Sequence, residues 1–347
     1  MSRLILPLLS LSLILICHTW SPVEPQTRER TVSRAKDDVI KVDVNLVVLD
    51  ALVLQQKTGR VVGNLKQEDF ILAEDGVRQR ITHFSQDTLP LSVIILIDRG
   101  GCLDPFGTKV HHATIEALSR LKPSDEVALM AYHNKVDLIE GFTRDRTKLA
   151  EALDRIPGHD EEANHCLNRA FYEAAQYMVN ASNPVSRRVI IVITGVTSNF
   201  DCSGPSGTAA RHEVYESGSV VCGLIPRSPA QQVENGATRM ATGIAGIFKA
   251  PTLSIKQLAD ETGGEILEDK PEYLDSTFNT LMDHLRTRYS MGFVSSNKKH
   301  DGSVRKLKLE ITPAAQRAAG GKLVVKTRRS YIAPKDEAEH IENHIHK

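Results

Sequence analysis

The sequence has no excess of charge, because 43 lysines and arginines balance 43 aspartates and glutamates among 347 residues. Proteins that bind nucleic acid usually present a basic surface, so this balance argues against a nucleic-acid partner. The phosphate-binding pattern Gly-x-x-x-x-Gly-Lys-Ser/Thr is missing, and so is the Gly-x-Ser-x-Gly pattern of serine hydrolases. We find no arrangement of residues that predicts an enzyme.

Long apolar runs are missing after the first twenty residues. Leu4–Cys17 is apolar almost throughout, follows a short basic start, and is too short to span a bilayer comfortably. Such a segment is typical of a secretory signal peptide, which we place at residues 1–20, and an uncleaved signal anchor is the alternative. We therefore expect a secreted or periplasmic protein with no membrane span after signal removal.

Cysteine is scarce as well. The chain has five, and removal of the signal would leave Cys102, Cys166, Cys202 and Cys222. An even number in an oxidising compartment favours disulfides, although four cysteines allow three pairings. Cys222 lies within an apolar strand pattern and is most simply a small core residue.

The rest of the chain divides into segments of different character. Residues 21–38 are polar and contain prolines, which is typical of a flexible linker. Residues 39–87 carry short alternating runs and turn signals, which predict a small β-rich unit of sandwich type. In residues 88–287 strand and helix patterns alternate, as in a parallel sheet covered on both faces. Residues 288–334 return to strand patterns and are expected to pack with the amino-terminal unit, because each piece alone has too few strands. Residues 335–347 form a charged tail that we expect to be flexible.

The strongest single signal is Leu91–Asp98, which is apolar almost throughout and shows no alternation. Such a run is typical of a strand buried on both faces at the centre of a parallel sheet. It ends on Asp98, and α/β folds place their ligands at the carboxyl ends of such strands. We therefore predict an α/β fold with a doubly wound, mostly parallel sheet, plus the small sandwich-like unit from the flanking strands. Further strands are expected at 126–132, 136–142, 187–195, 220–225, 265–267, 289–294, 306–311 and 322–326, and helices at 108–121, 145–156, 163–179, 255–262 and 273–286.

This organisation resembles the von Willebrand factor type A (vWA) domain, and in particular the exported vWA-related proteins of acidobacteria. The resemblance is carried by Glu68-Asp69-Phe70, by Glu74-Asp75-Gly76, by the strand that ends on Asp98, and by Leu-Ala-x-x-Thr-Gly-Gly at 258–264. It implies a vWA/Rossmann-like sheet. It also implies protein–protein or surface recognition through the face formed by the carboxyl ends of the strands.

In the vWA family this face holds a divalent metal through Asp-x-Ser-x-Ser, a threonine from one later loop and an aspartate from another. By position, these slots fall on Asp98, Gly100, Cys102, His165 and Gly195. Only Asp98 keeps a ligand of the family type, whereas Mg²⁺ requires several hard oxygen ligands. The resemblance therefore predicts a degenerate site without Mg²⁺, and no cofactor is expected.

Cysteines fall in three of the loops that meet at the same end of the predicted sheet. A disulfide between two of Cys102, Cys166 and Cys202 is the first expectation, since it would tie these loops in an exported protein. The alternative is a soft-metal site, with zinc held by Asp98, Cys102, His165 and Cys166, or by Cys202 in place of one of the other two cysteines.

Together these features predict an exported, non-enzymatic binding or scaffold protein whose partner is an unidentified protein or surface. The alternative is a metal- or redox-responsive protein in which the cysteine and histidine cluster is the active element. Stoichiometric zinc after purification would favour the second hypothesis, and a disulfide without metal would favour the first.

Overall fold

The computed structural model describes residues 46–86, 89–156, 164–197, 202–227 and 253–335. The predicted signal peptide and linker, the first residues of the β-rich unit and nearly all of the predicted tail lie outside these ranges. Within them, no helix is both long and apolar enough to cross a membrane.

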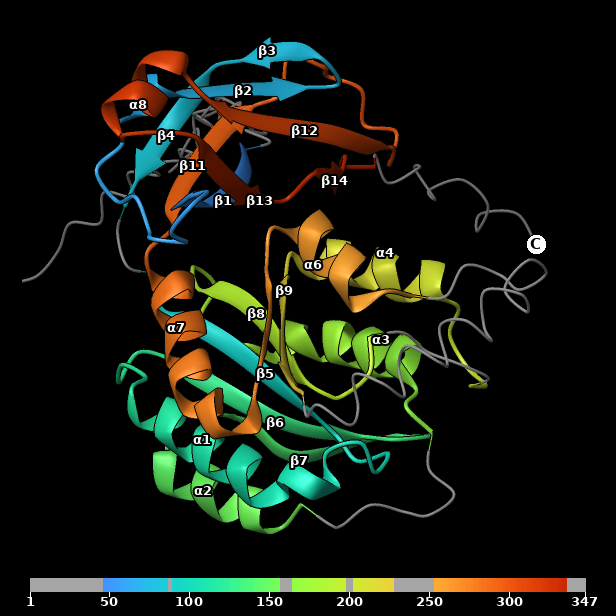
Figure 1. The fold of residues 1–347 in the computed structure, drawn as a ribbon. Helices are drawn as coiled ribbons and strands as arrows, with labels where there is room; N and C mark the ends of the chain where they lie inside the picture. The colour runs from blue at the N-terminus through green and yellow to red at the C-terminus, as the bar shows by residue number, and fades with distance from the viewer. Residues whose placement is uncertain (1–45, 87–88, 157–163, 198–201, 228–252, 336–347) are drawn as a thin grey trace, which may run out of the picture. The chain divides into compact units, whose positions relative to one another are not determined.

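A six-stranded sheet forms the centre of the α/β part, in the order β10-β9-β8-β5-β6-β7. All neighbouring strands run parallel except β7, which pairs antiparallel with β6 (Figure 1). The predicted fold class is therefore confirmed. The strands are β5 (Leu91–Asp98), β6 (Glu126–Tyr132), β7 (Val136–Thr143), β8 (Arg187–Ile193), β9 (Val220–Pro226) and β10 (Ile266–Asp269).

Strand β5 lies between β6 and β8, and all eight of its residues are buried. Its apolar side chains alternate between two cores, because successive residues of a strand point to opposite faces of the sheet. Val93 and Ile95 belong to one core, and Ile94 and Leu96 to the other. This burial on both faces explains why the sequence shows no alternation along the strand.

Among the residues that the structure describes, three helices cover each face of the sheet (Figure 1). Helices α1 (Gly107–Ser119), α2 (Arg146–Asp154) and α7 (Leu274–Arg286) pack on one face. Helices α3 (Leu167–Tyr177), α4 (Gly207–Ser217) and α6 (Ile255–Thr262) pack on the other. The sequence reading missed α4, although Ser206 caps its first turn and Gly218 ends it in the left-handed conformation at φ 68°. The helix was not predicted because its apolar face is short, and only Ala210 and Val214 of that face enter the core.

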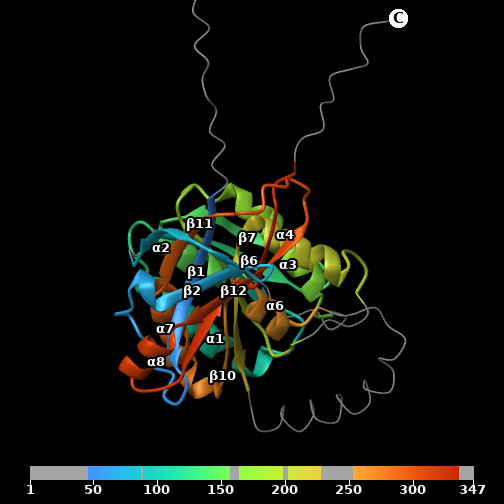
Figure 2. The same cartoon turned by 90° about the horizontal axis from the view of Figure 1, so that it is seen from above.

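Strands from both ends of the described chain form a β-sandwich of two four-stranded sheets. Strand β1 pairs with β11 and β13, and β12 pairs with β2, which lies beside it in Figure 2. The expected pairing of amino- and carboxyl-terminal strands is thus what the structure contains. One sheet has the order β13 (Leu323–Thr327), β1 (Leu46–Gln55), β11 (Tyr289–Val294), β4 (Ile81–Ser85), and the other β14 (Ser330–Ile332), β12 (Val304–Ile311), β2 (Phe70–Glu74), β3 (Val77–Gln79). Helix α8 (Pro313–Ala318) and strand β14 were not predicted.

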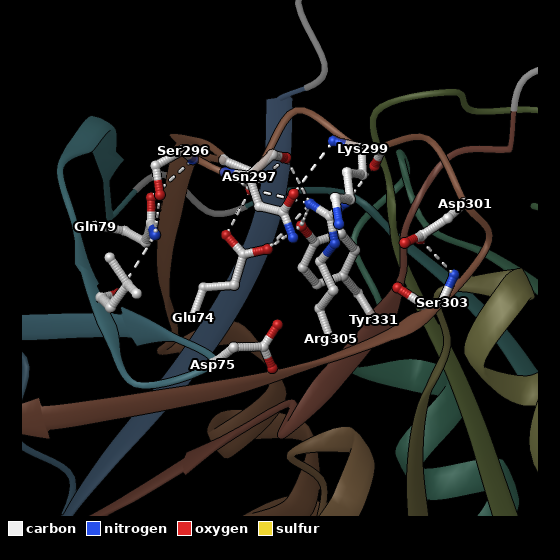
Figure 3. A network of polar contacts seen from close by, with 12 residues as sticks. Glu74, Asp75, Gln79, Ser296, Asn297, Lys299, Asp301, Ser303, Arg305 and Tyr331 are labelled. Atoms are coloured by element: carbon white, nitrogen blue, oxygen red, sulfur yellow. Dashed lines mark hydrogen bonds and ion pairs between the residues drawn. The ribbon is translucent and has the colours of Figure 1, made fainter.

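A buried ionic network fixes one end of the sandwich (Figure 3). The Glu74 carboxylate accepts hydrogen bonds from Arg305 at 3.2 Å, from the Tyr331 hydroxyl at 2.8 Å and from the Ser295 hydroxyl at 2.6 Å. The Arg305 guanidinium also donates to the carbonyl of Asn297 at 2.8 Å. Because Glu74 and Arg305 are each 2% exposed, the loop that follows β11 is held by charged groups out of contact with water.

A second ion pair, between buried Arg187 and partly buried Asp50, joins the sandwich to the α/β part. Arg187, the first residue of β8, donates through Nε to Asp50 of β1 at 2.8 Å and through Nη1 to the carbonyl of Leu285 in α7 at 2.5 Å. The Ser290 hydroxyl of β11 donates to the same carboxylate at 2.6 Å. Burial alone would raise the pKa of Asp50, but the charge and hydrogen bonds of Arg187 outweigh it and hold that pKa below its ordinary value.

We predict that Asp50 contributes to acid unfolding. A carboxyl with a depressed folded-state pKa stabilises the fold above its unfolded pKa of about 4, and this stabilisation is lost as pH falls through the folded value. Urea unfolding of Asp50→Asn should show a lower free energy at pH 7 and a shallower loss of stability from about pH 5 downward. The exposed Glu310, which pairs with Lys308, provides the matched control as Glu310→Gln. An unchanged pH slope in Asp50→Asn would contradict the assignment.

Candidate functional site

The carboxyl ends of the central parallel strands bring the predicted site residues together. Strand β5 ends on Asp98, its neighbour β6 ends on Tyr132, and Thr194 follows the other neighbour, β8. His165 lies just before α3, which covers this edge from one face of the sheet. Parallel strands place these loops side by side, as the fold class requires.

The Asp98 carboxylate accepts hydrogen bonds from four groups of its own chain. Nδ1 of His165 lies 2.9 Å from both carboxylate oxygens, and the Gly100 amide donates to Oδ1 at 2.8 Å. The hydroxyls of Thr194 and Tyr132 donate to Oδ2 at 2.5 and 3.0 Å. Asp98 is only 3% exposed, so these donors take the place of water around the charge.

This environment keeps Asp98 ionised. Burial alone would raise the pKa of the carboxyl, but the hydrogen bond and charge of His165 outweigh it, with help from Thr194 and the Gly100 amide, and the pKa is lowered. An ionised carboxylate can only accept hydrogen bonds, so the proton of the contact sits on Nδ1 of His165. The imidazole therefore presents its other nitrogen, Nε2, away from Asp98.

Gly100 makes the contact between His165 and Asp98 possible. A Cβ atom on Gly100 would lie 2.5 Å from Nδ1 and 2.6 Å from Cε1 of the imidazole. The φ angle of Gly100 lies outside the left-handed region, so space rather than backbone conformation explains the glycine. Gly100, which falls in the second ligand position of the predicted pattern, therefore lies directly against the His165 imidazole.

Cys102 and Gly195 form a similar pair. The Gly195 amide donates to Cys102 Sγ at 3.1 Å, and a Cβ on Gly195 would lie 3.0 Å from Cβ of Cys102. The Thr194 hydroxyl lies 3.9 Å from the same sulfur. Burial and the neighbouring Asp98 charge raise the pKa of the Cys102 thiol, so it stays protonated and is a poor nucleophile.

The disulfide joins Cys166 to Cys202, with Cα atoms 5.5 Å apart. Cys166 is the residue before α3, and Cys202 lies in the loop between β8 and α4, so the bond ties two loops at this end of the sheet. Cys102, the third predicted candidate, is a thiol and not part of a disulfide. The soft-metal alternative with Cys166 as a ligand is therefore incompatible with this structure, because a sulfur in a disulfide has no thiolate to offer.

Magnesium does not fit these residues. Mg²⁺ prefers near-octahedral oxygen ligands, and among the five family positions Asp98 alone supplies a carboxylate. Both of its oxygens are already engaged by protein donors, with an imidazole where the family has a threonine. The cluster that could hold some other cation is Asp98, Cys102 and His165, since one ligand atom from each lies within 4.8 Å of the others.

Two contributors were missed by sequence reasoning. Tyr132 and Thr194 each donate to Asp98, although neither stands in a slot of the family pattern. The signal for Tyr132 was present, because it is the last residue of the predicted strand 126–132 and aligns with Asp98 across the parallel pair. Thr194 directly follows β8, the other neighbour of β5. Its hydroxyl therefore lies at the carboxyl end of the sheet, within reach of Asp98.

A pocket of about 490 Å³ lies beside the cluster, between β5, α1 and α2. Its wall is mainly apolar, with Ile97, Leu103 and Leu153 at its surface, and Asp98 also contributes to it. His111 and Asp154, which lie 2.9 Å apart, form part of its polar lining. Most of the pocket wall is therefore suited to an apolar group, with charged side chains among the lining residues.

We predict that Gly100→Ala displaces His165 and destabilises the fold by about 1–3 kcal/mol, because the new Cβ overlaps the imidazole and breaks its bond to Asp98. Gly107→Ala is the control, since nothing lies within 4 Å of a Cβ there. In a His165→Ala background the cost of Gly100→Ala should largely vanish, which chemical denaturation of the four variants measures. Equal costs in both backgrounds would show that Gly100 acts independently of His165.

Residues 93–197 match the family model of the von Willebrand factor type A domain. No curated protein matches the sequence.

Similar solved structures include a multiple-serine mutant of an aerotolerance-related membrane protein from Bacteroides fragilis, at 15% identity and a TM-score of 0.40, covering 56% of this chain and 98% of that one. The PilB minor pilin from Streptococcus sanguinis is 9% identical with a TM-score of 0.41, covering 58% and 63%. The vWF domain of the type V pili tip protein Mfa5 from Porphyromonas gingivalis is 10% identical with a TM-score of 0.38, covering 56% and 95%. TM-scores this low carry no argument about function. The match to the family model and the observed sheet order agree that the chain contains a vWA-like α/β fold.

Proposed function

We propose that this protein is an exported, non-enzymatic binding module that recognises a protein partner or surface without using Mg²⁺. The observation that carries the proposal is the state of Asp98, whose two oxygens are engaged by donors from the same chain. vWA domains are in general interaction modules, and a face that is closed by its own side chains can bind a partner only through those side chains and the surrounding loops.

The chemistry of the site also argues against catalysis. A nucleophile needs an adjacent base and a lowered pKa, whereas the pKa of the Cys102 thiol is raised. The imidazole of His165 is directed to Asp98 through Nδ1, so this nitrogen faces a carboxylate rather than the thiol. These residues therefore shape and charge a surface rather than carry out a reaction.

Export is supported by two independent features. The apolar amino terminus has the length of a signal peptide rather than of a membrane span. The disulfide between Cys166 and Cys202 belongs to an oxidising compartment, since structural disulfides are rare in the reducing cytosol. We propose a secreted or periplasmic location on these grounds.

The test is capture of partners from the secreted and surface fraction of the source cells by the immobilised protein. Two exposed residues beside the disulfide, Asn164 and Ser203, are changed together to arginine, and Val185→Arg at the opposite end of the sheet, 65% exposed, is the control. We predict a specific set of bound proteins that is unchanged by EDTA and by Val185→Arg but is lost in the double variant. Loss of binding in EDTA, restored by Mg²⁺, would contradict the proposal.

A further inference from the structure

We propose that Asp98, Cys102 and His165 form a binding site for one thiophilic divalent cation of the zinc class. This inference does not depend on the proposed partner binding, because it concerns the buried cluster rather than the surrounding surface. It retains three of the ligands in the soft-metal alternative and excludes Cys166, whose sulfur is in the disulfide.

The spacing of the donor atoms carries the inference. One oxygen and one sulfur from the end of β5 and the connection that follows it, and one nitrogen from the loop before α3, lie within 4.8 Å of one another. In a tetrahedral zinc site with metal–ligand bonds of about 2.0–2.3 Å, neighbouring ligand atoms are about 3.2–3.7 Å apart. The Asp98 oxygens and His165 Nδ1 are 2.9 Å apart, so they would separate by a few tenths of an ångström as the cation takes the place of the proton between them. The Cys102 sulfur, which lies within 4.8 Å of both atoms, would move toward them as the cation binds.

The identity of the donors selects the class of cation. Thiolate, imidazole and carboxylate together suit zinc and its neighbours in the first transition series, whereas Mg²⁺ and Ca²⁺ require oxygen ligands. Backbone amides orient two of the three ligands from outside, since Gly195 donates to the sulfur at 3.1 Å and Gly100 to the carboxylate at 2.8 Å. Such outer contacts fix the direction of a ligand before the metal arrives.

Charge and protons balance on binding. Asp98 is already ionised and Cys102 releases its thiol proton to the solvent. The single proton of the His165 imidazole moves from Nδ1 to Nε2 by exchange with water, which frees Nδ1 to bind the cation. The two negative ligands then neutralise the two positive charges of the cation. Without a cation, the same carboxylate disfavours the thiolate by its charge, which is one cause of the raised thiol pKa. The His165 side chain is 26% exposed and gives the cation a route from the solvent.

The experiment is titration of the full chain, with its disulfide intact, with Co²⁺ followed by absorption spectroscopy. A thiolate ligand gives a charge-transfer band in the near ultraviolet, and tetrahedral Co²⁺ gives intense visible bands. The variants are Cys102→Ser and His165→Ala, and Cys222→Ser is the control because that thiol is buried within β9. Circular dichroism establishes that each variant is folded.

We predict one Co²⁺ per chain for the wild type and for Cys222→Ser, displaced by added Zn²⁺. The charge-transfer band should be absent in Cys102→Ser, and His165→Ala should weaken binding about tenfold or more. Absence of the band in the wild type, or its survival in Cys102→Ser, would overturn the inference. That result would leave the Mg²⁺-independent binding proposal standing, since partner capture in EDTA is measured separately.

Discussion

The contact between Asp98 and His165 holds together the loops at the carboxyl ends of the parallel strands. A carboxylate that is 3% exposed at the end of the central strand needs compensation, because an uncompensated buried charge costs several kcal/mol. Here the compensation comes from an imidazole, two hydroxyls and an amide of the same chain. The charge of this carboxylate is therefore balanced by donors of the protein itself, which are present at any metal concentration.

The residues around Asp98 fit one another. Gly100 leaves the space that His165 occupies, and Gly195 leaves the space beside Cys102. A larger residue at position 100 alone would displace His165, because even one Cβ at Gly100 overlaps the imidazole. The disulfide from Cys166 adds a covalent tie next to His165, and a link closing a loop of this length stabilises a fold by about 2–4 kcal/mol. These positions act as one unit, in which small residues accommodate larger ones.

The sequence was most informative where burial is uniform. Strand Leu91–Asp98 was predicted with the bounds that the structure shows, because a strand buried on both faces leaves a continuous apolar run. Helix α4 was not predicted because its apolar face is short. The contact of Tyr132 with Asp98 was not predicted because it depends on the register of two strands, which no local pattern shows. The ion pair between Arg187 and Asp50 could not be predicted either, because the two residues are 137 positions apart in the sequence. The candidate site positions were found by resemblance, but the way in which glycine and histidine fit together is visible only in three dimensions.

A protonated imidazole nitrogen of His165 lies against the buried carboxylate of Asp98 at the end of the central strand. Nuclear magnetic resonance of the imidazole nitrogens, with and without millimolar Mg²⁺, tests this claim most directly. In protein freed of transition metals, Nδ1 of His165 should carry a proton that is hydrogen-bonded to Asp98, and its signals should not respond to Mg²⁺. An unprotonated Nδ1, or a saturable shift of the His165 signals with Mg²⁺, would contradict the account.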